Sequence, residues 1–171
     1  MKKNVFQLVG LLLLLPFLAG CNESDDIAAI FTGKTWRLNY ITEDGGHEMF
    51  NFWGSDLTAR ENSYKELEER GNYNIVFEGI ADGNVITNGQ IRGNVIKSIA
   101  VEGKWSANGK DNSFKANVTT GNVNSDILAK HFIEGLNTAT SYEGDTNGNL
   151  YLKYKAGQRT YRMVFYAINN K

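Results

Sequence analysis

Apolar and polar positions alternate along several short stretches of the chain. One face of each stretch carries large apolar side chains, as in Trp36 to Tyr40, Tyr73 to Phe77 and Leu150 to Tyr154. A period of two residues is typical of a β-strand with one buried face. We therefore expect strands at these three places.

Pairs of Gly with Asn or Asp separate the apolar stretches at intervals of roughly 8–12 residues. They are Asp44-Gly45-Gly46, Asp82-Gly83-Asn84, Asn88-Gly89, Gly93-Asn94, Asn108-Gly109 and Asn147-Gly148. Such pairs supply the positive φ angles that tight hairpin turns require. The spacing predicts an antiparallel sheet in an all-β or α+β domain.

The stretch from Tyr161 to Ile168 differs because both of its faces are largely apolar. A strand of this kind is typical of a sheet that is covered on both sides. We expect it to be a central strand with a helix packed against it.

One helix is strongly indicated. Asn124-Ser125-Asp126 offers capping side chains, and Leu128, Phe132 and Leu136 follow on one helical face. The segment from Ser55 to Arg70 is highly charged with few apolar positions. That segment is consistent with either a surface helix or a mobile loop.

The first 21 residues have the pattern of a secretory signal. Lys2 and Lys3 precede an apolar run from Leu8 to Ala19, and small residues follow it. The run of twelve residues is shorter than the ~20 residues that a membrane-spanning helix needs.

Leu18-Ala19-Gly20-Cys21 resembles the lipobox of bacterial lipoproteins. The resemblance implies that Cys21 receives a diacylglyceryl thioether, that the chain is cut before it, and that the new amine is acylated. Three acyl chains would hold the protein on a membrane, whereas one chain alone binds reversibly. We therefore expect a signal peptide at 1–21, an acidic tether at 22–31 and one β-rich domain at 32–171.

The residues after Cys21 bear on the membrane that the protein reaches. Asn22 to Asp26 is polar and acidic, which is consistent with a solvated tether. It also resembles the export tag of some Gram-negative surface lipoproteins. Asp directly after the Cys would indicate inner-membrane retention, and Asn22 at that position favours the outer membrane.

From about Asn72 to Ile168 the chain resembles the META domain of heat-shock-type lipoproteins. The resemblance rests on Lys130 to Asn137, Ser141-Tyr142, Leu150 to Leu152 and Met163 to Phe165, with Trp36-Arg37-Leu38 as the opening strand. It implies an α+β fold in which one main helix packs on an antiparallel, partly closed β-sheet, with no catalytic residue to carry over. A lipocalin-like barrel is the competing architecture.

Charge, cysteine content and missing motifs argue against several classes of function. The formal net charge is −1 and the chain has one Cys, which argues against a nucleic-acid partner, a disulfide and a multi-cysteine metal site. The motifs of common hydrolases and nucleotide-binding proteins are missing from the sequence. We therefore expect no enzyme activity and no cofactor.

Three sets of residues could carry other chemistry, and each has a simpler structural explanation. His47 and His131 lack a third metal ligand at a suitable spacing. Asp145 to Asn149 begins like a calcium loop but lacks its later positions, so a hairpin turn is favoured. Glu66, Glu68 and Glu69 are typical of a solvated helix face.

Aromatic residues give the best indication of binding. Trp53 and Trp105 could stack on sugar rings or cover an apolar ligand, although core packing is favoured for both. We expect a lipid-anchored envelope protein that binds a protein partner or supports the envelope. The alternative is a lipocalin-like carrier of a small apolar or glycan ligand, which would need an apolar cavity of roughly 300 Å³ or more.

Overall fold

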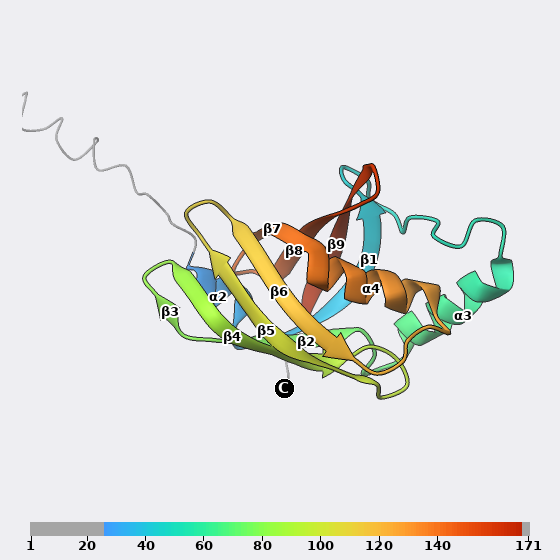
Figure 1. Cartoon of the computed structure of the whole chain (residues 1–171), viewed down its shortest axis with the longest axis horizontal. Coiled ribbons are helices and arrows are strands. Elements are labelled where there is room, and N and C mark those ends of the chain that lie inside the picture. The colour runs from blue at the N-terminus through green and yellow to red at the C-terminus, as the bar shows by residue number, and fades with distance from the viewer. Residues whose placement is uncertain (1–25, 169–171) are drawn as a thin grey trace, which may run out of the picture.

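The computed structural model describes residues 26–168. Three helices are interspersed among nine strands (Figure 1). The helices are α2 (Ile27–Phe31), α3 (Leu57–Glu68) and α4 (Ile127–Thr138). The strands are β1 (Thr35–Glu43), β2 (Asn74–Glu78), β3 (Ala81–Asp82), β4 (Val85–Asn94), β5 (Ala100–Asn108), β6 (Ser113–Thr120), β7 (Ala139–Gly144), β8 (Asn149–Ala156) and β9 (Arg159–Ile168).

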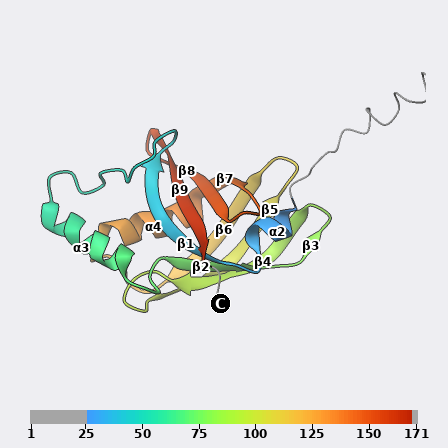
Figure 2. The same ribbon diagram turned by 180° about the vertical axis from the view of Figure 1, so that it is seen from behind.

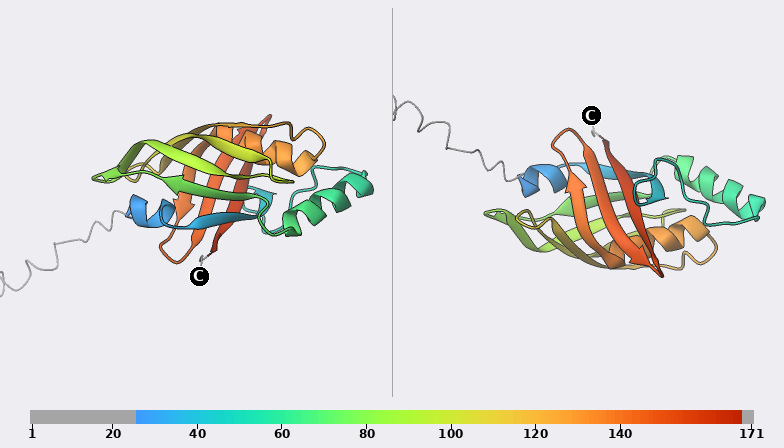
Figure 3. Two further views of the ribbon diagram at one scale, coloured as in Figure 1. Left: turned by 90° about the horizontal axis from the view of Figure 1, so that it is seen from below. Right: turned by 90° about the horizontal axis from the view of Figure 1, so that it is seen from above.

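Eight of these strands close into an antiparallel barrel of the lipocalin-like kind. Their order is β2-β1-β9-β8-β7-β6-β5-β4, and β2 also pairs with β4, which joins the two ends of the sheet. The short strand β3 extends the start of β4. The expected α+β class with a sheet closing on itself is therefore confirmed. The left view of Figure 3 shows the green and yellow strands on one side of the barrel and the orange and red strands with β1 on the other.

The alternation seen in the sequence becomes the inside and outside of the barrel. In β1, Trp36, Leu38 and Ile41 are at most 1% exposed. A bulge between Leu38 and Tyr40 keeps the inward face apolar after the period of two breaks. Rings from several elements meet in the interior, where the Phe31 ring centroid lies 4.8 Å from Trp105 and 5.1 Å from Phe77. Large aromatic side chains therefore fill the space that a lipocalin-like carrier would leave for a ligand.

Helices α2 and α4 lie at opposite ends of the barrel (Figures 1 and 3). Helix α2 is capped by Asp26, whose carboxylate accepts bonds from the backbone of Ala28 and Ala29. Its Ile27, Ile30 and Phe31 are buried. The domain thus starts further upstream than expected, since these residues fall within the range assigned to the acidic tether.

Helix α4 is the helix indicated most strongly by the sequence. Asp126 caps it by accepting a 2.8 Å bond from the Ala129 N–H. Phe132 packs at 5.4 Å from the Tyr73 ring and at 6.2 Å from the Phe165 ring. The helix is inserted between β6 and β7, whose only register pair is Ser113 with Ser141 among the residues described.

The segment 55–70 forms a surface helix rather than a loop. Asp56 caps α3, and Ser63 is its one buried residue. Figure 2 shows α3 on the outer side of the barrel end that α4 closes. None of the helices within residues 26–168 has the length and apolar character needed to cross a membrane.

Two predictions about the sheet were wrong. Asn88-Gly89 and Gly93-Asn94 make no turns, because both pairs lie within β4 and are hydrogen-bonded to neighbouring strands. Thr87 and Asn88 form a bulge there, and Asn88 has φ of 56°. The last strand, β9, is central between β1 and β8 as expected, but α4 contacts only its inner face through Met163 and Phe165. On the outer face Tyr166 remains 40% exposed.

Candidate functional site

Cys21 is the residue expected to carry the lipid anchor. Cys21 and the acidic residues before Asp26 lie outside the described residues. Asp26 is the first described residue. The chain there lies beside the β3–β4 turn, since the Ile27 N–H is 3.4 Å from the Asn84 side-chain oxygen Oδ1.

Trp105 is a core residue. It is 2% exposed, and its Nε1 donates a 3.1 Å bond to the backbone oxygen of Glu78. The indole reaches that oxygen from β5 by passing beneath Gly89 of β4, where a Cβ atom would lie 2.3 Å from Nε1. The ring therefore ties three strands together and is almost wholly buried.

Trp53 fixes α3 to the loop that precedes it. It is 6% exposed, and its Nε1 donates a 3.0 Å bond to the Ser63 hydroxyl. Its ring centroid lies 5.7 Å from that of Tyr64. The structure does not bring Trp53 and Trp105 together, since one lies outside the barrel and the other inside.

The two histidines are far from forming a metal site. His47 is exposed, whereas His131 stacks on Phe52 with 3.9 Å between ring centroids. Burial lowers the pKa of His131, and the nearby Glu134 carboxylate, 3.3 Å from Nδ1, opposes that shift. No group of three or more His, Cys, Asp and Glu side chains suited to a metal ion occurs between residues 26 and 168.

The remaining acidic candidates have local partners. The Asn149 side-chain amide donates a 2.9 Å bond to the Asp145 carboxylate, and the backbone N–H groups of Asn149 and Asn147 donate further bonds; together they lower the pKa of that carboxyl. Glu66 accepts a bond from Asn72 and pairs with Lys97. The first is the hairpin turn favoured by the sequence, and the second lies on a polar hollow of about 400 Å³ between α3 and α4.

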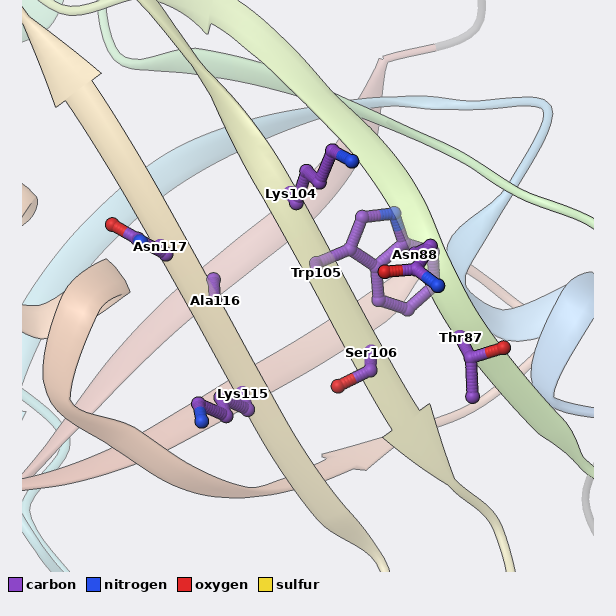
Figure 4. Close-up of a pocket in the computed structure, with 8 residues that line it drawn as sticks. All are labelled: Thr87, Asn88, Lys104, Trp105, Ser106, Lys115, Ala116 and Asn117. Atoms are coloured by element: carbon purple, nitrogen blue, oxygen red, sulfur yellow. The ribbon is translucent and has the colours of Figure 1, made fainter.

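A groove of about 280 Å³ runs over the outer face of β4, β5 and β6 (Figure 4). Its walls come from Thr87, Asn88, Lys104, Lys115 and Asn117, and Ser106 lies in its floor. The bulge in β4 places both Thr87 and Asn88 on this rim opposite Ser106. The small Ser106 side chain between longer neighbours creates the hollow.

The groove combines cations with hydrogen-bonding groups. Within residues 26–168 no ion-pair partner reaches the Lys104 or Lys115 ammonium. Hydroxyl and amide groups of four further side chains surround them. Ala116 and part of Trp105 also line the groove. The ammonium, hydroxyl and amide groups can bind a ligand that carries anionic and hydroxyl groups.

A tyrosine wall occupies the opposite side of the barrel. We define it as the outer face of β1, β9 and β8 with Tyr40, Tyr151, Tyr166, Val164 and Arg162. Val164 is paired with Tyr40 on one side and with Tyr151 on the other, which leaves it only 7% exposed although it faces outward. The Arg162 guanidinium lies 5.1 Å from the Tyr151 ring centroid.

One feature of the sequence, the apolar outer face of the last strand, indicates this wall. The apolar outer face of Tyr161 to Ile168 was expected to meet a helix, but tyrosines from neighbouring strands cover part of it. Tyr40 and Tyr151 belong to two of the alternating stretches, and only the strand register brings them to the same valine.

Comparison with known families gives one match. A family model described as a domain of unknown function (DUF4847) matches residues 22–167. The chain belongs to this family. Its model spans the described barrel from α2 almost to the end of β9. No curated protein matches the chain.

Proposed function

We propose that this member of the DUF4847 family is a lipid-anchored protein of the bacterial envelope that binds another envelope protein and performs no catalysis. The lipobox at Leu18 to Cys21 supports the anchor, and Asn22 after the Cys favours the outer membrane. The resemblance to the META domain, another lipoprotein domain, agrees with this role.

The tyrosine wall is the observation that carries the proposal. Tyr and Arg are enriched in protein interfaces because they combine a large apolar area with polar groups. Here Tyr40 and Tyr151 flank a buried valine, and Tyr166 is 40% exposed beside them. The outer face of three neighbouring strands offers a broad surface to a folded protein.

Charges surround the tyrosine wall and would select the partner. Lys153 pairs with Glu143 at 2.6 Å, and the two lie on neighbouring strands at its edge. Glu43 pairs with Arg159 at 3.1 Å. A rim of both signs around an aromatic centre is the usual anatomy of a specific interface.

The filled interior supports binding at the outside. Trp36, Tyr73, Phe31, Phe77 and Trp105 are each at most 2% exposed within the barrel. A lipocalin-like carrier holds its ligand in that space. The carrier alternative would require these side chains to leave well-packed positions, which is costly.

Site-specific photo-crosslinking tests the proposal. A photoreactive residue replaces Tyr166 in the anchored protein in its native cells, and we expect one defined crosslinked partner. The variants Tyr40→Ala and Tyr151→Ala should lose that crosslink, while Tyr64→Ala on α3, whose side chain is also exposed, should retain it. A crosslink that persists in all three variants would exclude the tyrosine wall.

A further inference from the structure

We infer that the wall of β4, β5 and β6 faces the bilayer that carries the anchor, and that its groove binds a phosphate-bearing lipid headgroup. This inference rests on the proposed acylation of Cys21. It assigns a ligand class to the groove and an orientation to the barrel, neither of which follows from partner binding alone.

The length of the tether limits how far the barrel can lie from the membrane. Four residues separate Cys21 from Asp26, and the five intervening peptide units span at most about 18 Å when fully extended. The point at which the described chain begins must therefore stay near the headgroups.

That point is on the same side as the groove. The Ile27 N–H lies 3.4 Å from Asn84 Oδ1, and the Asn84 backbone oxygen accepts a 2.8 Å bond from Gly109 of the β5–β6 turn. Asn84 is followed directly by β4, whose Thr87 lines the groove. Helix α2 itself lies on the inner side of β4 and β5 (Figure 3), where the Phe31 ring centroid is 4.8 Å from that of Trp105.

The strand register places an exposed aliphatic residue in line with the groove. Ala81 pairs with Ile86, so Ile80 continues toward Thr87 on the outer face. Across β4 the bulge at Thr87 and Asn88 lies opposite Ser106, which pairs with Lys115. One row across the wall therefore runs from an isoleucine that is 92% exposed, through hydroxyl and amide groups, to a lysine.

This row matches the chemistry of a bilayer surface. The Lys104 and Lys115 side chains point to opposite ends of the groove (Figure 4), so either ammonium group can pair with a lipid phosphate. The hydroxyl and amide side chains can bond to headgroup oxygens. Ile80 can reach the apolar region just below, as interfacial side chains do. The exposure of Ile80 in water is then explained by burial in lipid.

The overall charge of this wall does not attract it to the membrane, because acidic residues lie among its cations. Glu78 pairs with Arg92 on the same wall, and Glu102 lies one row beyond Lys104. Asp82 ends β3 and Asp111 lies in the β5–β6 turn, so both acidic residues are at the α2 end. The covalent anchor therefore supplies the encounter, and the lysines act at short range on a phosphate.

The groove side and the tyrosine wall then have separate functions. In the eight-stranded ring β5 and β9 lie four positions apart, so the groove and the tyrosine wall are diametrically opposite. When the groove rests on lipid, the tyrosine wall points away from the membrane and toward a partner.

Fluorescence quenching in proteoliposomes tests the orientation. The chain has one Cys, whose sulfur is in the thioether after acylation, so an introduced cysteine is the only free thiol. Thr119→Cys on β6, outside the groove, and Asn39→Cys on β1 are matched substitutions at exposed positions on opposite sides of the barrel. Each purified full-length acylated variant carries an environment-sensitive dye in vesicles of phosphatidylethanolamine and phosphatidylglycerol that contain a nitroxide-labelled lipid.

We expect the lipid nitroxide to quench the dye at residue 119 several-fold more strongly than the dye at residue 39. Adding Lys104→Gln and Lys115→Gln should abolish most of that difference, whereas Lys130→Gln and Lys155→Gln, which remove two exposed lysines elsewhere, should preserve it. Equal quenching at both positions, or stronger quenching at 39, would overturn the orientation. Preserved quenching in the double groove variant would overturn the headgroup site.

Mass spectrometry of the same samples shows whether the chain is acylated, and so distinguishes a failure of the proposed anchor from a failure of the proposed orientation. An unacylated chain with a free Cys21 thiol would contradict the anchor itself. An acylated chain without the expected difference in quenching would contradict only the orientation.

Discussion

The side-chain amide of Asn137 pairs with the backbone of Val118 as a neighbouring strand would. Its oxygen accepts a 2.7 Å bond from the Val118 N–H, and its Nδ2 donates a 3.2 Å bond to the Val118 carbonyl. Asn137 lies near the end of α4, and Val118 is in β6. The helix thus supplies hydrogen bonds along the part of the seam where β6 has no register pair with β7.

Removing this amide should destabilise the barrel. Asn137→Ala leaves two backbone groups of Val118 without their partner, and an unsatisfied group costs about 1–3 kcal/mol. We expect a lower urea midpoint with an unchanged m-value in equilibrium unfolding. Asn62→Ala, at an exposed position of α3, is the matched control and should have little effect. Equal midpoints for the two variants would mean that water satisfies the Val118 backbone without cost.

A methyl group at Gly89 should conflict with Trp105. The added Cβ would lie 2.3 Å from the indole nitrogen and 2.8 Å from the Glu78 backbone oxygen. Overpacking of this kind costs about 1–3 kcal/mol, so Gly89→Ala should lower the free energy of unfolding. Gly121→Ala is the control, because its Cβ would meet only an Ile99 side-chain carbon at 3.1 Å.

A second substitution identifies the cause of that loss. Trp105→Phe removes the indole nitrogen that the methyl group would touch, so the loss caused by Gly89→Ala should be smaller in the Trp105→Phe background. A double-mutant cycle measures this coupling. Additive effects would show that the strain at Gly89 does not come from the indole.

Stability should fall in mild acid because of His131. Burial keeps the pKa of His131 in the folded protein below its usual value of about 6.5. The unfolded chain therefore binds the proton more readily, and the free energy of unfolding decreases as the pH falls from 6.5 toward the lower folded value. Above 6.5 the contribution is fully present.

Comparing two histidine variants checks this dependence. His131→Gln should flatten the stability profile between pH 7 and the acid limb, as measured by thermal unfolding across a pH series. His47→Gln, at an exposed position, should leave the profile as it is. A profile that His131→Gln does not change would assign the acid sensitivity to the carboxylates instead.

The lipid anchor makes a direct prediction. Cys21→Ala removes the sulfur on which the thioether forms, so the precursor should remain uncut and should take up no labelled fatty acid. Ser24→Ala, three residues further along, is the control and should be processed and labelled normally. Continued labelling of the Cys21→Ala chain would contradict the lipoprotein assignment.

Much of the fold could be predicted from short-range patterns. Alternation at Trp36 to Tyr40 and at Leu150 to Tyr154 located strands β1 and β8, and the Asp126 cap with its apolar face located α4. These signals are local because pleating and helix capping depend on residues within one or two turns of each other. The lipobox is local for the same reason, since a few adjacent residues define it.

The prediction of a turn at Asn88-Gly89 failed because a hairpin turn and a β-bulge share the same local sequence preference. Asn88-Gly89 has the positive-φ preference of a hairpin turn, and a β-bulge uses the same preference. Only pairing with β5 decided that the chain continues as a strand there. The length of β4 and the shape of the groove both follow from that choice.

The sequence by itself determined the anchor signal, the alternating strands and the capped helix α4, because each depends on neighbouring residues. Closure of the barrel decided the rest. It buried Trp105, brought Tyr40 and Tyr151 to opposite sides of Val164, and aligned Ile80 with Lys115 across four strands. Strand register sets these relationships, and register results from the packing of the whole barrel rather than from any one segment.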